Sequence, residues 1–181
     1  MVIRGMSADR AEADLIRAAR GGDGAAFADL LRNEYPVAFR LAYGMLHDIG
    51  EAEDAVQDGA FNAWRRLGNL RDGSTLRPWF LGIVANQCRS VRRRRRWPAV
   101  KSERPEQEAP EADIAASVDL RRALIRLDYD QRLVLVLRYY LDMSFEEIAG
   151  TLGVSPKAAR TRVERAVHRL RPIVRMQEGL S

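Results

Sequence analysis

Residues 144–171, SFEEIAGTLGVSPKAARTRVERAVHRLR, constrain the fold most, because their helix signals come in a fixed order. Ser144 followed three residues later by Glu147 forms a capping box, in which each side chain binds a free backbone N–H of the first turn. Gly153 follows where a helix must end, because glycine takes positive φ without a Cβ clash. Ser155, followed by proline, is a second N-cap. The stretch therefore predicts two helices joined by a tight turn.

The second of these helices has two unlike faces. The apolar residues that recur at helical spacing are Ala159, Val163, Ala166, Val167, Leu170 and Val174. The residues of the opposite face are Lys157, Arg160, Thr161, Glu164, Arg165 and His168. Residues 157–175 hold seven lysine or arginine residues against one acidic residue. A basic, exposed second helix fits the major groove of DNA. The alternative is a solvated basic helix in a helical bundle.

Composition narrows the possible classes of protein. The 181 residues suffice for one domain or two small ones, and the hydrophobic fraction of 46% is enough for a core. No apolar run approaches a membrane span, and the amino terminus lacks the apolar segment of a signal peptide. The single cysteine, Cys88, excludes an internal disulfide and favours a soluble protein of a reducing compartment. The net charge of +5 favours a polyanionic partner.

Apolar spacing along the rest of the chain predicts an all-α protein without strands. Residues 1–8 are expected to be frayed. Helices are expected over residues 9–20, 24–35, 37–47, 51–67, 78–96, 115–127 and 128–141. Asp23 and Asp48 are expected N-caps, and the Gly, Asn, Asp and Ser content of residues 68–76 predicts a loop.

The predicted helix 51–67 also divides into unlike faces. The residues expected to pack inward are Ala52, Ala55, Val56, Gly59 or Ala60, Ala63 and Leu67, with Phe61 and Trp64 adding bulk. The polar residues on a different side are Asp54, Gln57, Asp58 and Asn62. An acidic face in a basic protein favours docking on a basic protein surface, because charge complementarity orients association. An ordinary solvated face is the alternative.

The middle of the chain changes composition abruptly. Residues 92–96 are five consecutive arginines, which form a solvated tail in most proteins and grip a phosphate backbone in others. Residues 98–113 then hold three prolines, five acidic residues against two basic ones, and almost no bulky apolar residue. This composition predicts a flexible acidic linker between two small helical domains.

Three motifs, in this order, resemble the extracytoplasmic-function (ECF, group four) sigma factors of the sigma-70 family. EAEDAVQDGAFNAW resembles the polymerase-binding helix of region 2, and LRPWFLGIVANQCRSVRRRRR resembles the helix after its promoter-reading loop. LVLVLRYYLDMSFEEIAGTLGVSPKAARTRVERAVHRLR resembles region 4, the helix-turn-helix. The resemblance implies region 2 over residues 10–96, a linker over 97–114 and region 4 over 115–175.

The resemblance further implies an alternative sigma factor, which binds core RNA polymerase, directs it to specific promoters and helps open them. The residues that match the face docking on the clamp helices of the largest polymerase subunit are Asp54, Gln57, Asp58 and Asn62. Region 4 is expected to meet the flap of the second largest subunit. The residues expected at the minus-ten element are Asn69, Leu70, Arg71, Asp72, Ser74, Thr75, Asn86, Arg89, Arg92 and Arg93. Those expected at the minus-thirty-five element are Ser155, Lys157, Arg160, Thr161, Arg162, Glu164, Arg165 and Arg169.

The family resemblance also implies a cytoplasmic protein without catalytic residues, metal or cofactor. Its expected partners are core RNA polymerase, promoter DNA and an anti-sigma factor, often membrane-tethered, without direct insertion of this chain into a membrane. Two positions depart from the family pattern. Ala158-Ala159 stand where the family more often has Thr-Val, and Tyr129 stands where a proline is common.

Three alternative functions compete with this interpretation. A self-standing helix-turn-helix repressor or activator would need a dimer to read two half-sites. An enzyme acting on nucleic acid would need metal-binding carboxylates or a nucleophile with its base, whereas Cys88 falls on an apolar face and is interpreted as core. His47 and His168 are far apart in sequence, and Asp54 with Asp58 is a conceivable metal pair. A sigma-like decoy that binds regulators is the third alternative.

Overall fold

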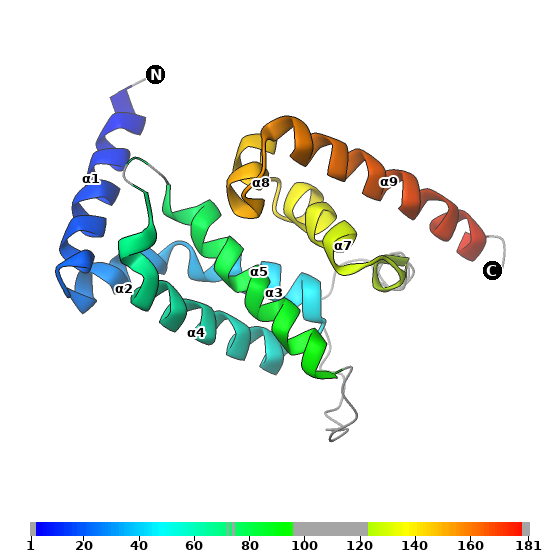
Figure 1. The fold of residues 1–181 in the computed structure, drawn as a ribbon, viewed down its shortest axis with the longest axis horizontal. Helices are drawn as coiled ribbons and strands as arrows, with labels where there is room; N and C mark the ends of the chain where they lie inside the picture. The colour runs from blue at the N-terminus through cyan, green and yellow to red at the C-terminus, as the bar shows by residue number, and fades with distance from the viewer. Residues whose placement is uncertain (1–2, 72, 74, 96–122, 179–181) are drawn as a thin grey trace.

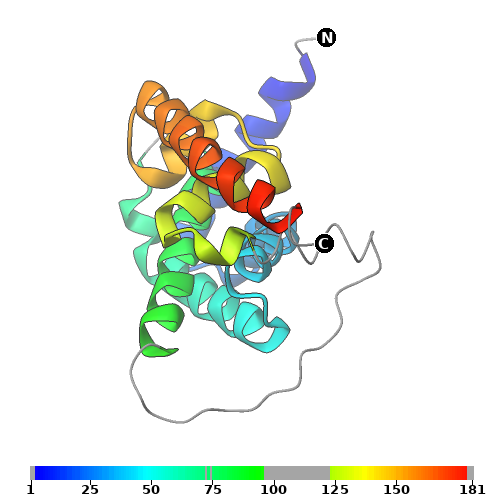
Figure 2. The same cartoon turned by 90° about the vertical axis from the view of Figure 1, so that its right-hand side faces the viewer.

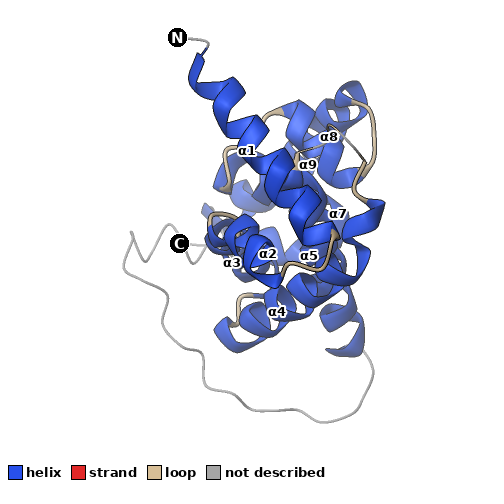
Figure 3. Cartoon of the chain, turned by 90° about the vertical axis from the view of Figure 1, so that its left-hand side faces the viewer, coloured by secondary structure: helices blue, strands red, loops and turns tan. Residues whose placement is uncertain are grey.

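The computed structural model of the chain describes residues 3–71, 73, 75–95 and 123–178 (Figure 1). Before residue 96 lie α1 (Ile3–Arg20), α2 (Gly24–Arg32), α3 (Tyr35–Leu46), α4 (Ile49–Arg66), η1 (Leu67–Asn69) and α5 (Leu76–Arg95). After residue 122 lie α7 (Tyr129–Leu135), η2 (Val136–Tyr140), α8 (Phe145–Leu152) and α9 (Pro156–Glu178). Figure 3 shows only helices and loops among these residues, which confirms the all-α prediction. The predicted linker, 97–114, lies outside the described residues.

Polar caps start the helices where the sequence predicts them. The carboxylate of Asp23 accepts hydrogen bonds from two backbone N–H groups in the first turn of α2, and Asp48 accepts one from the first turn of α4. Ser144 and Glu147 form both halves of the capping box, at 3.2 and 2.8 Å. Gly153 ends α8 in the left-handed conformation, with φ of 65°. These signals come from neighbouring residues, so they set the helix boundaries locally.

Several predicted helix boundaries are wrong; for example, α2 ends at Arg32 and Tyr35 begins α3. Helix α1 begins at Ile3, within the stretch expected to be frayed, because each residue added to an existing helix gains a hydrogen bond and no proline interrupts it. Helix α5 begins at Leu76 rather than Pro78, since proline is tolerated throughout a first turn whose N–H groups lack intrahelical partners. The Leu76 N–H instead donates to the Glu12 carboxylate at 2.8 Å. The predicted helix 128–141 ends in a π-helical turn, Val136–Tyr140.

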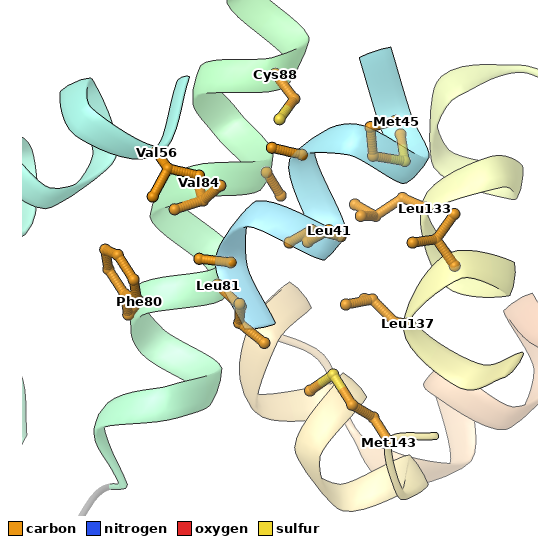
Figure 4. Packing of buried hydrophobic residues seen from close by; sticks show 14 of the residues in the cluster. Leu41, Met45, Val56, Phe80, Leu81, Val84, Cys88, Leu133, Leu137 and Met143 are labelled. Carbon is orange, nitrogen blue, oxygen red and sulfur yellow. The ribbon is translucent and has the colours of Figure 1, made fainter. Parts of the chain in front are cut away.

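The first group of helices packs around α3 and α5. Leu41 and Met45 of α3 meet Val84 and Cys88 of α5, all at most 1% exposed (Figure 4). Helix α4 approaches α5 closely at Gly59, where an added Cβ would lie 2.8 Å from a methyl group of Val84. A side chain there would force these helices apart, so glycine is required by packing rather than by φ.

The second group, α7 to α9, packs against the first group and continues its core. In Figures 1 and 2 the two groups lie side by side, with α8 beside α5. Leu133 and Leu137 come from α7 and η2, and Figure 4 shows both side chains facing α3. The buried apolar side chains of the two groups form one contiguous cluster. The exposed faces of α4, α5 and α9 are therefore held in one arrangement.

Candidate nucleic-acid and protein interfaces

Helix α4 presents the acidic face that its sequence predicts. Asp54, Gln57 and Asp58 are exposed, and Asn62 is half-buried with its amide donating to the Asp58 carbonyl at 2.8 Å. Among the described residues, neither Asp54 nor Asp58 has an ion-pair partner. The opposite face of α4 is buried through Ala52, Ala55, Val56, Gly59 and Ala63. Because the opposite face of α4 is buried, the acidic face points toward solvent.

Phe61 corrects the expected composition of the inward face of α4. Its side chain is 62% exposed and lies beside the Arg65 guanidinium, 5.7 Å from the ring centroid. Trp64 does pack inward, with its ring 5.0 Å from that of Phe27. Phe61 follows Asp54 by seven residues and Asp58 by three, which is the spacing of one helix face. The sequence therefore contained the signal that places Phe61 on the acidic face.

The residues of the loop between η1 and α5 that are predicted to bind DNA lie partly on the surface and partly in the core. Asn69, Arg71 and Thr75 are exposed, whereas Asp72 and Ser74 lie outside the described residues. Leu70 is only 2% exposed, so its side chain packs in the core in this structure and is not on the surface where DNA would bind. An apolar side chain gains more from burial against the helices than from display in a loop. The Arg20 guanidinium donates to the Leu70 carbonyl and ties this end of the loop to α1.

Helix α5 carries four predicted residues, and the second group of helices contacts two of them. Asn86, Arg89 and Arg93 are exposed, and Arg92 is half-buried. Arg89 pairs with the Asp130 carboxylate, and its guanidinium lies 4.7 Å from the centre of the Tyr129 ring. The Arg92 guanidinium lies 5.7 Å from the same ring. The cationic end of α5 is therefore partly occupied by the start of α7.

Helix α9 keeps its basic face open. The exposed residues of this face are Lys157, Arg160, Arg162, Glu164, Arg165, His168 and Arg169, with Thr161 half-buried. The Arg160 guanidinium lies 4.6 Å from the Phe145 ring centroid, which orients the side chain without covering it. Ser155 serves as the N-cap, its hydroxyl accepting the Ala158 N–H at 3.2 Å. Burial of Ala159, Val163 and Ala166 turns the basic face outward.

Two buried titratable groups lie away from these exposed faces. Burial raises the pKa of the Cys88 thiol to about 12, so the thiol stays protonated, as its core interpretation requires. The Arg132 guanidinium is buried and donates to three backbone carbonyls, while burial and then the charge of Arg92 lower its pKa to about 10. Within the described ranges no three His, Cys, Asp or Glu side chains gather as a metal site. No helix in those ranges is long and apolar enough to cross a membrane.

Comparison with known proteins identifies the family. A sequence model of sigma-70 region 2 matches residues 30–98, and one of sigma-70 region 4 matches residues 117–170. The ECF RNA polymerase sigma factor SigM of Mycobacterium tuberculosis (strain H37Rv) is 33% identical over 166 residues, which cover 90% of this chain and 84% of that protein. The chain belongs to the ECF sigma factors of the sigma-70 family. Helices α4 and α5 of this sigma factor fall in region 2, and α8 and α9 fall in region 4.

Solved structures agree with this assignment. The sigma factor is similar to CnrH, solved in complex with the cytosolic domain of CnrY, with a TM-score of 0.69, 27% identity and coverage of 92% of this chain and 98% of that one. It is also similar to the sigma factor RpoE of Bartonella quintana, solved in complex with the anti-sigma factor NepR. That match has a TM-score of 0.63, 26% identity and coverage of 82% of this chain and 96% of that one.

Proposed function

We propose that this sigma factor binds core RNA polymerase through α4, directs it to specific promoters and helps open them. The acidic face of α4 carries the proposal, because it stays exposed and without ion-pair partners among the described residues of a protein with a net charge of +5. Asp54, Gln57, Asp58 and Asn62 would dock on the clamp helices of the largest subunit. Phe61 adds an apolar anchor at the same face, since aromatic side chains that become buried at the centre of an interface contribute much of the binding energy. Region 4 would meet the flap of the second largest subunit.

Region 4 would read the minus-thirty-five element with α9. Arg160, Thr161, Glu164 and Arg165 would face base edges in the major groove, because they lie on the exposed side of the second helix of the helix-turn-helix. Arg162 and Arg169 would bind flanking phosphates, with Lys157 and Ser155 at the helix start. A bidentate arginine contact contributes about 1–3 kcal/mol of discrimination against the wrong base.

Region 2 would hold the unpaired minus-ten strand. Asn69, Arg71, Asp72, Ser74 and Thr75 would capture a flipped base, and the residues that would bind its backbone are Asn86, Arg89, Arg92 and Arg93. Flipping a base costs a few kcal/mol of stacking, which these contacts must offset. Mounting region 2 (10–96) and region 4 (115–175) on one polymerase through the linker (97–114) makes two weak DNA contacts act together through effective concentration.

The proposed activity is binding rather than bond chemistry, since polymerase itself makes the RNA. A cytoplasmic location follows from the need to meet polymerase on the chromosome. An anti-sigma factor is the proposed restraining partner, because the similar Bartonella sigma factor was solved with one. A self-standing repressor would leave the acidic face of α4 without a role.

The decisive experiment reverses the charge of the docking face. The double substitution Asp54→Lys with Asp58→Lys should weaken binding to core polymerase about 100-fold, because like charges at an interface oppose association. The matched control is Asp14→Lys with Asp29→Lys, which changes the net charge equally at two other exposed sites. Affinity is measured by fluorescence anisotropy, and run-off transcription with start-site mapping identifies the promoters. Unchanged affinity in the first variant would show that polymerase docks elsewhere.

Phe61→Ser sharpens the same test. The substitution should weaken polymerase binding about tenfold and leave the melting temperature unchanged, because the ring is already exposed. A drop in melting temperature with unchanged affinity would show that Phe61 stabilises the fold and does not contact polymerase.

A further inference from the structure

Helix α1 holds both ends of the loop between η1 and α5. The Arg20 guanidinium at the end of α1 donates to the Leu67 carbonyl at 3.3 Å and to the Leu70 carbonyl, where the loop begins. The Glu12 carboxylate, earlier in α1, accepts the backbone N–H of Leu76 at 2.8 Å, where the loop ends and α5 begins. One helix thus contacts the backbone on both sides of the loop.

The two loop ends carry backbone polar groups beside buried side chains. Leu70 and Leu76 are each 2% exposed, which limits the access of water to the backbone next to them. The N–H of Leu76 opens α5 and has no partner within its own helix. A carboxylate is a favourable partner, because the N-terminal end of a helix carries partial positive charge. Glu12 and Arg20 therefore complete the hydrogen bonding of both loop ends.

Helix α1 acts as a rigid spacer between these two contacts. Glu12 and Arg20 are eight residues apart, which corresponds to about 12 Å along a helix. Between them, Ile16 and Ala19 are buried in the core, so α1 cannot slide or turn without losing that packing. A six-residue stretch such as the loop could by itself take any end-to-end distance up to about 20 Å. The contacts with α1 restrict that distance.

A bidentate ion pair fastens the first turn of α5 a second time. Arg77 donates to both carboxylate oxygens of Glu34, at 2.8 and 3.2 Å. Glu34 lies between α2 and α3, and its side chain is only 13% exposed. The end of the loop is therefore held by the ion pair as well as by Glu12, so the loss of Glu12 alone should release it only partly.

Side chains next to the held ends face solvent. Arg71 and Thr75 are exposed, and each directly neighbours a buried leucine. Both belong to the set proposed to capture a flipped minus-ten base. Hydrogen bonds to a base edge need donor and acceptor within about 3 Å of each other, so a base pocket tolerates only small displacements of its backbone. Base selection should therefore depend on the groups that hold the loop ends.

We propose that Glu12 and Arg20 are positioning residues for minus-ten recognition, which set the separation of the loop ends and thereby the shape in which the loop captures a base. This role rests on the proposed function, because it assumes that the loop reads the minus-ten element. Both residues act through the loop backbone and need no contact with DNA. Selectivity for the minus-ten sequence should thus depend on α1, a helix to which the sequence assigned no DNA contact.

Removal of each contact tests this role. Arg20→Ala should lower discrimination between the correct minus-ten sequence and its single-base variants about fivefold, because the released loop end no longer has one position. Glu12→Ala should lower it about threefold, since the ion pair of Arg77 still holds that end. Discrimination at the minus-thirty-five element should stay unchanged. Run-off transcription by the holoenzyme measures both ratios, on templates altered one base at a time from a promoter found by start-site mapping.

A conservative substitution separates positioning from stability. Glu12→Gln keeps an oxygen that can accept the Leu76 N–H, so it should retain the minus-ten discrimination that Glu12→Ala loses. Amide hydrogen exchange of Leu76 reports the contact itself and should be faster in Glu12→Ala than in Glu12→Gln. Asp14→Ala and Arg17→Ala are the matched controls, because these residues form an exposed ion pair on the same helix.

The outcomes separate this role from the proposed function. Unchanged minus-ten discrimination in both alanine variants would overturn the positioning role, and so would an equal loss at both promoter elements or in the controls. If Arg20→Ala does not fold, Arg20→Lys keeps the test decisive, because a compact ammonium group lacks the planar fork that donates to two carbonyls at once. It should lower minus-ten discrimination alone. Absence of promoter-specific transcription by the unmodified sigma factor would instead overturn the proposed function.

Discussion

The two helices proposed to contact promoter DNA differ in how accessible their cations are. Helix α9 buries small apolar residues such as Ala159 and Ala166 on one side and leaves its arginines in solvent on the other. Helix α5 is packed against α3 and α4 on one side and against α8 on the other. Its Arg89 is consequently paired with Asp130 of region 4.

This difference indicates an order of events. The face of α9 can meet duplex DNA without any rearrangement of the chain, whereas Arg89 of α5 must first release the Asp130 carboxylate of region 4. Duplex exists before the promoter opens, and the unpaired strand exists only afterwards. The helix whose arginine is paired within the chain is thus the one whose ligand appears last.

The largest effect on DNA recognition is expected at α9, whose basic face is exposed. Arg160→Ala should lower discrimination between the correct and altered minus-thirty-five sequences by about 1–3 kcal/mol, because a bidentate base contact is lost. Affinity for core polymerase should stay unchanged. Arg171→Ala, an exposed residue further along the same helix, is the control for loss of one positive charge. Run-off transcription from matched and mutated templates measures the effect. An equal loss on every template would show that Arg160 contacts a DNA phosphate rather than a base.

A smaller effect is expected at α5, where Arg89 is paired with Asp130. Asp130→Asn keeps the shape of the side chain and removes the charge that holds Arg89, so a single-stranded minus-ten oligonucleotide should bind up to about fivefold more tightly, which corresponds to an ion pair of about 1 kcal/mol. Asp142→Asn removes the same charge from an exposed site in region 4 and serves as the control. Equal affinities of the two variants would mean that the ion pair does not restrain Arg89.

Local chemistry made most of the fold predictable. Asp23, Asp48 and Ser144 each cap the helix that begins directly after them, and the positive φ of Gly153 ends α8. Only a few neighbouring residues are needed to predict these features. Apolar spacing likewise identified the buried faces of α4 and α9. The exposure of Phe61 was readable from its spacing to Asp58 but was outweighed by its apolar character.

Contacts between distant segments were not predictable in the same way. Gly82 and Thr151 touch across 69 residues, and nothing local to either residue specifies the other. The burial of Leu70 depends on helices that fold around the loop. Charge pattern and family resemblance predicted that α5 and α9 bind DNA, whereas the contact of α5 with α8 within the chain required the structure.

The smallest predicted effect is a dependence of folding stability on pH, and it distinguishes the buried face of α5 from that of α9. Folding raises the pKa of the Cys88 thiol in α5 from 9.0 to about 12. Because the folded value is the higher one, the stabilisation is fully present below pH 9 and is lost as the pH rises and the unfolded thiol ionises. Between pH 8 and 9.5 the free energy of unfolding should therefore fall by about 0.8 kcal/mol from this group.

Urea denaturation at both pH values measures this fall, and Cys88→Ala is the comparison. The variant should be less stable at pH 8 because a buried sulfur is removed, yet its stability should decline less toward pH 9.5. The buried face of α9 offers alanine and valine at Ala159, Val163 and Ala166, which do not titrate. Of these two buried faces, only that of α5 should therefore contribute alkaline destabilisation, and an equal decline in both proteins would show that the thiol is not its source.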